Sequence, residues 1–183
     1  VFSTISGTTY YTTENTPELK SNIILSIHPY KKDMYLVGTY GGGLYLFNTR
    51  TRQINKFEDK PIYTDNSFYS VIESPHSDDI LWFATLSGLI KHDVRNNTRQ
   101  IISTQNSNII SDDIYFLETD SSNRIWIATR NGVCYLDEKD QIHPLSIEGL
   151  PSIGIVWYVY EDSKNNIWLA CENQGTFVIS NDL

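Results

Sequence analysis

Short apolar runs recur along the chain and alternate with polar segments that favour turns. The runs are rich in Ile, Val, Tyr, Trp and Thr, a composition typical of β-strands. The polar segments contain Pro, Asp, Ser and Asn, as in PYKKD at 29–33, PHSDD at 75–79, DSSNR at 120–124 and DSKNN at 162–166. No window keeps the period of an amphipathic helix. The pattern therefore predicts an all-β protein.

A two-strand unit is repeated along the sequence. The aligned copies are MYLVGTYGGGLYLFN from Met34, ILWFATLSGLIKHD from Ile80, RIWIATRNGVCYLD from Arg124 and NIWLACENQGTFVIS from Asn166. A truncated copy, VFSTISGTTYY, opens the chain. A further apolar run precedes each full copy, at 23–27, 68–72, 114–118 and 156–160, and another strand is predicted at 53–57, 99–103 and 141–145. A repeat of about 40–45 residues with three or four strands is typical of a β-propeller blade.

The repeats predict a single β-propeller fragment over residues 1–183, with about four four-stranded blades and a partial one. The expected units are a partial blade at 1–18, blades at 19–61, 62–106 and 107–148, and a blade lacking its last strand at 149–183. We therefore expect an open sector of a larger propeller. Because such a sector exposes sheet faces and edges, the remaining blades of the parent protein or a second copy should cover them.

The aligned columns have packing roles in this interpretation. We expect the aromatic column to fill the space between neighbouring sheets and the small residue two places later to let the sheets approach. The threonines should make sheet or turn hydrogen bonds, and the glycines after the turn should adopt positive φ or pack closely. These structural positions are Trp82, Trp126 and Trp168; Thr39, Thr85 and Thr129; and Gly43, Gly88, Gly132 and Gly175.

Composition excludes several classes of partner. The chain has 14 Lys and Arg against 22 Asp and Glu, a net charge of −8. Nucleic acid and anionic membranes require a basic surface, so we expect no nucleic acid and no direct membrane contact. The longest apolar run, near 155–160, is far shorter than the roughly 20 residues of a membrane helix. VFSTISG at the start has neither the basic nor the apolar region of a signal peptide.

Patterns for catalysis, metal binding and cofactor binding are lacking. The histidines fall in different repeats, at His28, His76, His92 and His143, which predicts no metal site. The GGG at 41–43 forms a turn between strands and precedes no helix. Adjacent carboxylates at Asp78–Asp79, Asp112–Asp113 and Glu161–Asp162 should point apart, whereas glycoside hydrolysis needs two that converge. We expect no catalytic residues and no cofactor, and Cys134 and Cys171 as buried free thiols.

Two repeats resemble a known family. DSSNRIWIATRNG at 120–132 and DSKNNIWLACENQG at 162–175 are similar to the two-component regulator propeller repeat. The first copy departs from it with Leu36 where Trp is usual, and the copy containing Trp82 lacks the leading Asp. The resemblance implies the periplasmic sensor region of a hybrid two-component system, common in Bacteroidetes, with the histidine kinase domain outside this chain.

The resemblance also implies a function without catalysis in this fragment. It implies that such a sensor detects oligosaccharides derived from glycans, rearranges as a dimer, and controls transcription of utilisation genes. Two alternatives stay open: a propeller scaffold for protein–protein contacts, and a sector of a propeller glycosidase or lyase.

Ligand-binding candidates follow from the arrangement of propeller loops. The turn between the second and third strands shares one face with the loop entering the next blade, and that face usually carries the ligand near the axis. Aromatic faces stack on sugars, and Asn, Asp and Arg bond to hydroxyl or acidic groups. The candidates are Tyr40, Arg130 and Glu172 in the turns, and Asn22, Asn66, Tyr69, Asp112, Tyr115 and Trp157 in the loops and strand starts. The alternatives are that Tyr69, Tyr115 and Trp157 are core residues, or that other blades hold the site.

Overall fold

Four antiparallel sheets make up the protein. The computed structural model describes residues 7–57, 66–146 and 153–180. The first sheet contains β1 (Ile24–Pro29), β2 (Met34–Thr39), β3 (Leu44–Asn48) and β4 (Gln53–Lys56), and the second β5 (Ser70–Ser74), β6 (Ser77–Thr85), β7 (Gly88–Asp93) and β8 (Thr98–Ile102). The third contains β9 (Ile114–Thr119), β10 (Ile125–Thr129), β11 (Gly132–Leu136) and β12 (Ile142–Pro144), and the fourth β13 (Val156–Glu161), β14 (Ile167–Cys171) and β15 (Gly175–Ile179).

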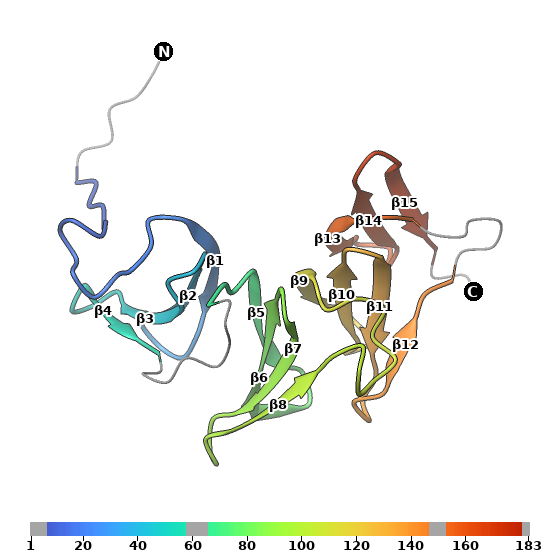
Figure 1. Cartoon of the computed structure of the whole chain (residues 1–183), viewed down its shortest axis with the longest axis horizontal. Helices are drawn as coiled ribbons and strands as arrows, with labels where there is room; N and C mark the ends of the chain where they lie inside the picture. Colours follow the sequence, from blue (N-terminus) through green and yellow to red (C-terminus); the bar gives the residue numbers. More distant parts are fainter. Residues whose placement is uncertain (1–6, 58–65, 147–152, 181–183) are drawn as a thin grey trace.

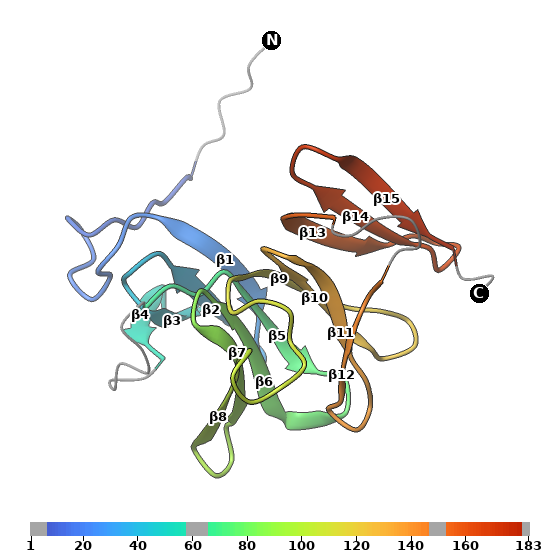
Figure 2. The ribbon, with the colours of Figure 1, turned by 45° about the vertical axis from the view of Figure 1, so that its right-hand side comes forward.

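Each sheet is a meander whose strands pair in sequence order, as in a propeller blade. The first strand of each sheet lies toward the centre and the last lies at the periphery (Figure 1). A second view shows the sheets arranged as an arc around that centre (Figure 2). The predicted all-β fold of blades is confirmed.

The ends and boundaries of the predicted units are less fully described. Residues 7–18 of the predicted partial blade contain no strand, and residues 1–6 lie outside the described residues. Two predicted boundaries fall in the segments 58–65 and 147–152, which also lie outside them. The exact blade limits therefore stay predictions.

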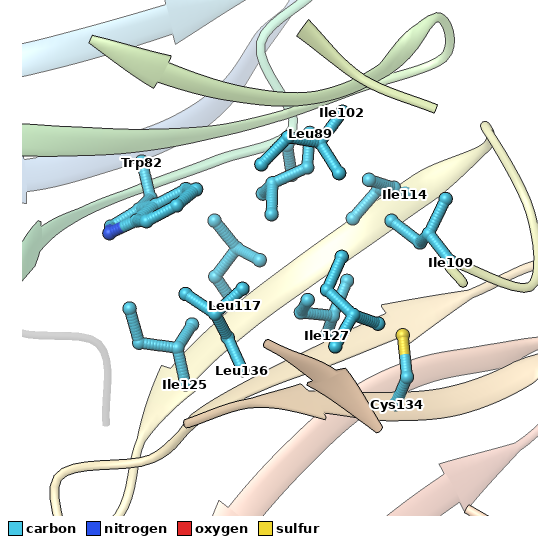
Figure 3. Close-up of a cluster of buried hydrophobic side chains, with 12 residues drawn as sticks. Trp82, Leu89, Ile102, Ile109, Ile114, Leu117, Ile125, Ile127, Cys134 and Leu136 are labelled. Carbon is cyan, nitrogen blue, oxygen red and sulfur yellow. The ribbon is translucent and has the colours of Figure 1, made fainter. Parts of the chain in front are cut away.

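Apolar side chains fill the spaces between consecutive sheets. Figure 3 shows Trp82 and Leu89 of the second sheet facing Leu117 and Ile127 of the third, in one buried cluster. Burying one such side chain completely contributes about 1.5–3 kcal/mol. Comparable clusters join the first sheet to the second and the third to the fourth. The blades are thus held together by packing of their faces.

Turns also join neighbouring blades. The N–H of Gly43 donates to the carbonyl of Asn66 at 2.9 Å, and the N–H of Gly88 donates to the carbonyl of Asp112 at 2.9 Å. Gly88 has a φ of +115°, and a Cβ there would lie 2.6 Å from the carbonyl oxygen of Ile102. Glycine is required here both by conformation and by space.

Repeated threonines close these turns from within each blade. Their hydroxyls donate to the carbonyl of the glycine at the start of the third strand or, in the first sheet, directly before it. The pairs are Thr39 with Gly43 at 2.8 Å, Thr85 with Gly88 at 2.7 Å and Thr129 with Gly132 at 2.9 Å. The same type of bond closes the turn in three consecutive sheets, although the turn of the first sheet is one residue longer than the other two.

The leading Asp of the two best-matching repeats organises the turn before the second strand. Asp120 accepts hydrogen bonds from the backbone of Ser122 and Arg124, from Arg124 Nε at 2.7 Å and from Trp126 Nε1 at 2.8 Å. In the second sheet no described acceptor bonds to the buried Nε1 of Trp82. The missing Asp in that repeat therefore has a direct structural consequence.

The fourth sheet has one open face. Trp168 is 41% exposed and Tyr160 is 52% exposed, whereas Trp82 and Trp126 are buried. Trp168 does not fill a space between sheets because no described sheet follows β15. Cys134 is a buried free thiol, but Cys171 is only partly buried, so the prediction that both are buried was wrong for Cys171. Cys171 ends β14 in this open sheet.

The opposite end of the arc is partly covered by the N-terminal segment. Leu19 is buried in a cluster with Tyr45, and the backbone N–H of Lys20 donates to the Tyr45 hydroxyl at 2.9 Å. The ring of Tyr11 packs edge-on against Phe47. The two ends of the arc are therefore unlike.

Candidate functional site

A β-bulge recurs in the innermost strands. The register against the second strand shifts at Leu25 in β1, at Tyr115 in β9 and at Trp157 in β13. In the second sheet Tyr69 occupies the matching place, directly before Ser70, which pairs with Ala84. A bulge bends the strand and redirects the side chain of its extra residue.

The redirected side chains form an aromatic surface along a groove. Tyr69, Tyr115 and Trp157, together with Leu25, line a groove of about 480 Å³ on the inner side of the sheets. The rings of Tyr69 and Tyr115 are 5.8 Å apart and meet edge to face, and those of Tyr115 and Trp157 are 4.5 Å apart. Trp157 is 46% exposed. Three blades thus contribute to one surface with accessible aromatic area.

Charged side chains stand at one end of this aromatic surface. Arg130 Nη1 donates to Asp113 Oδ2 at 3.1 Å, and the Arg130 backbone N–H donates to the Asp113 carbonyl at 3.0 Å. Burial foremost, and then the carboxylates of Asp113 and Glu172, raise the pKa of the Tyr115 hydroxyl, while Arg130 opposes them. These four side chains therefore share one electrostatic environment.

Backbone contacts hold this end of the groove in the same way in three blades. In each blade the donor is the backbone N–H of the residue that follows the repeated Thr or Cys. The acceptor is the backbone carbonyl of the residue two places before the bulge residue. The pairs are Tyr40 with Ile23 at 3.0 Å, Arg130 with Asp113 at 3.0 Å and Glu172 with Ile155 at 2.8 Å. The turns are thereby fixed next to the bulge.

The far end of the groove is lined by residues three places beyond the bulge. These are His28 on β1, Ile72 on β5 and Glu118 on β9. Burial lowers the pKa of His28, and its buried Nε2 has no hydrogen-bond partner among the described residues. Burial and then the charge of Glu161 raise the pKa of Glu118. This end is therefore mixed in polarity, unlike the aromatic end.

The structure brings together some of the candidates predicted from sequence and separates others. Tyr69, Tyr115 and Trp157 line the groove, and Arg130 and Glu172 act electrostatically on Tyr115. Arg130 and Glu172 stand beside the groove and do not line it. The remaining candidates do not line it either; they are Tyr40, Asn22, Asn66 and Asp112.

These remaining candidates have local contacts instead. Asn22 accepts from the N–H of Thr13 at 2.8 Å, and Asp112 accepts from the N–H of Thr104 at 2.7 Å. Asn66 uses its carbonyl for the bond to Gly43, and the side chain of Tyr40 is exposed.

Sequence reasoning missed Asp113, His28 and Glu118. From the sequence, Asp113 is expected only to point its carboxylate away from that of its neighbour Asp112. A usable signal existed, because Asp113 lies two places before an aromatic residue that recurs in three repeats. His28 and Glu118 each lie three places after the bulge position of their repeat, at Leu25 and Tyr115, so aligning the repeats on that position would have indicated them.

Among residues 7–57, 66–146 and 153–180, no three His, Cys, Asp or Glu side chains gather closely enough to bind a metal ion. Within the same ranges no helix has the length and apolar character needed to cross a bilayer. The described groups fit binding by stacking and hydrogen bonding.

Meanders that pack face to face around a central groove define a sector of a β-propeller, and solved structures share this fold. The extracellular domain of the hybrid two component system BT3049 from B. thetaiotaomicron superposes with a TM-score of 0.73 at 22% identity, over 94% of this chain and 22% of that chain. The extracellular domain of the one component system BT4673 from the same organism superposes with a TM-score of 0.67 at 19% identity, over 90% of this chain and 21% of that chain. The chain thus spans about a fifth of the length of these two proteins.

A propeller lyase is also similar in fold. A streptogramin B lyase structure superposes with a TM-score of 0.64 at 16% identity, over 86% of this chain and 51% of the lyase. No curated protein matches the sequence. Residues 149–173 match the family described as Two component regulator propeller, which confirms the resemblance predicted from the repeats.

Proposed function

We propose that the chain is part of the extracytoplasmic, periplasmic sensor domain of a two-component system. In this proposal it binds a glycan-derived oligosaccharide without turning it over. The observation that carries the proposal is the continuous surface of Tyr69, Tyr115 and Trp157 along the groove. The family match at 149–173 and the fold shared with extracellular domains of such systems support the cellular role.

The chemistry of the groove fits a sugar ring. The C–H faces of a pyranose pack on aromatic rings, and the exposed part of Trp157 offers such a face. Arg130, Asp113 and Glu172 stand beside Tyr115, where donors and acceptors meet the hydroxyls at the edge of a stacked ring. Apolar walls with a few placed polar groups are typical of small-molecule sites.

Signalling requires more than binding. A ligand shifts the equilibrium between two signalling states only through different affinities for them. The aromatic surface is built from three blades, so a ligand lying along it contacts all three at once. We propose that the resulting change passes to a histidine kinase outside this chain, which controls transcription of the utilisation genes.

Substitution of the exposed groove aromatic tests this function. Trp157→Ala should weaken binding of the tightest oligosaccharide in a broad panel at least about tenfold, measured by calorimetry. Tyr10→Ala is the matched control, because Tyr10 is an exposed aromatic that does not line this groove. Unchanged affinity in Trp157→Ala, or absence of any oligosaccharide binding, would contradict the proposal.

The alternatives lead to different outcomes in the same samples. A glycosidase or lyase would shorten the panel oligosaccharides on incubation, and the fold shared with streptogramin B lyase makes this control necessary. A scaffold would retain a protein partner in the Trp157→Ala variant and bind no sugar. We expect intact oligosaccharides and bound sugar.

The open face of the fourth sheet has a separate proposed role, as the contact for another blade of the parent protein. In the sheet before it, the equivalent face carries Trp126 and is covered by the next blade. In the isolated chain we expect this face to pair with a second copy. Light scattering should then show a mass above the 21.0 kDa of one chain, and Trp168→Ser should lower it. A monomer before substitution would contradict self-association.

A further inference from the structure

We infer that the groove selects uncharged oligosaccharides over uronate-containing or sulfated ones, with Asp113 and Glu172 as the residues that set this preference. The inference rests on the proposed function, because it concerns the charge of the ligand bound along the aromatic surface. It follows from the distribution of charge around the groove.

The cation beside the aromatic surface is already paired. The Arg130 guanidinium donates to the Asp113 carboxylate, and the Arg130 backbone N–H donates to the Asp113 main-chain carbonyl. An anionic group approaching Arg130 would therefore meet Asp113 at the same time. The pair is partly exposed, with the side chain of Asp113 29% accessible, so Asp113 can face an incoming ligand.

Further negative charge lies close to this pair. Glu172 is exposed, acts on the Tyr115 hydroxyl with the same sign as Asp113, and forms no ion pair with a described basic side chain. Two carboxylates and one guanidinium thus lie near Tyr115 at the aromatic end. A carboxylate or sulfate on the ligand would be repelled there, because like charges at short range disfavour binding.

The walls of the groove supply no compensating positive charge. Among the described lining residues there is no Lys and no Arg. Burial lowers the pKa of His28, against the smaller opposing effect of Glu73, and so disfavours a positive charge there, and Glu118 lies at the same end. The whole chain carries a net charge of −8, which adds to the repulsion of anions.

A neutral sugar gains from the same arrangement. Carboxylate oxygens accept hydrogen bonds from hydroxyl groups, and bonds to a charged acceptor are stronger than neutral ones. The guanidinium of Arg130 retains N–H groups beyond the Nη1 bond to Asp113 and can donate them to hydroxyl or ring oxygens. The charged groups therefore bind an uncharged polyol and disfavour an anion.

The test compares oligosaccharide classes on the full chain. An array of neutral, uronate-containing and sulfated oligosaccharides of matched length is probed, and affinities of the positive members are measured by calorimetry. We expect binding to the neutral class at least tenfold tighter than to either anionic class. Equal or tighter binding of an anionic class overturns the inference and leaves the proposed function standing. Binding to no class overturns the proposed function.

A charge-removing variant tests the assigned residues. Glu172→Gln combined with Asp113→Asn should raise affinity for uronate-containing members at least tenfold and make that affinity fall with added salt. Asp78→Asn combined with Asp79→Asn removes the same two charges and is the control for net charge, because both side chains are exposed on β6 and neither lines the groove. If the double variant does not fold, the single variant Glu172→Gln replaces it in the test, because it changes only an exposed side chain. Unchanged selectivity in a folded variant overturns the assignment.

Discussion

Replacing Asp120 by alanine removes the acceptor of four hydrogen bonds in the turn between β9 and β10. Its most costly consequence falls on Trp126, which is 2% exposed and whose Nε1 would be left buried without an acceptor. An unsatisfied buried donor costs about 1–3 kcal/mol, and losing the charged bond to Arg124 adds to it. We expect a total loss of about 3 kcal/mol, a large part of the 5–15 kcal/mol by which domains are typically stable.

Asp162 provides a matched comparison within the same molecule. It accepts the corresponding bonds from the backbone of Lys164 and Asn166, from Asn166 Nδ2 and from Trp168 Nε1. Trp168 is 41% exposed, so water can replace the lost acceptor. Asp162→Ala should therefore destabilise the chain clearly less than Asp120→Ala.

Urea unfolding followed by tryptophan fluorescence measures both variants. We expect a lower urea midpoint for Asp120→Ala than for Asp162→Ala, with a similar dependence of the unfolding free energy on urea in both variants. Equal losses of stability would refute it, because they would show that the motif acts through the shape of its turn and not through the burial of the tryptophan.

Three further outcomes are expected. Cys171 should react with a thiol reagent before Cys134 in the folded chain, because Cys134 is buried and burial raises its pKa to about 12. Mass spectrometry identifies the modified residue, and faster reaction of Cys134 would contradict this expectation. The free energy of unfolding should fall as the pH drops from about 4 toward 2. The bond to His143 lowers the pKa of Asp137 from 3.8 to about 2 in the folded chain, so the unfolded chain binds the proton first. In Asp137→Asn this acid-induced loss of stability, measured by circular dichroism, should be smaller. Gly88→Ala should lower the melting temperature more than Gly41→Ala. Both glycines have positive φ, but only at Gly88 would the new Cβ meet the Ile102 carbonyl. Equal shifts in melting temperature would show that the cost comes from the backbone conformation alone.

The repeated pattern was sufficient to predict the strands and their order. Apolar runs, turn residues and the recurring columns each depend on local sequence, and the runs at 114–118 and 156–160 became β9 and β13. The bulges could not be predicted in the same way. A one-residue register shift at Tyr115 or Trp157 depends on hydrogen bonds to the neighbouring strand, and these are not encoded by alternation of apolar and polar residues.

The same limit explains the errors at individual residues. Whether Asp112 or Asp113 meets Arg130 depends on the course of the chain just before the bulge, so adjacency alone could not decide between them. The exposure of Trp168 and Cys171 depends on whether another sheet covers the fourth, and this is not a property of their own repeat. Local pattern thus predicted the blades better than the surfaces between and around them.

In the proposed function, the bulge residues separate recognition from folding. Leu25, Tyr115 and Trp157 stand outside the paired register of their strands. Around Tyr115 and Trp157 the buried clusters are built from other residues of the same strands, such as Ile114 and Leu117 or Val156 and Val159. A change at one bulge position therefore alters the groove while leaving the packing between blades in place. If the proposed function holds, a library randomised at one bulge residue per blade should alter ligand specificity on an intact scaffold.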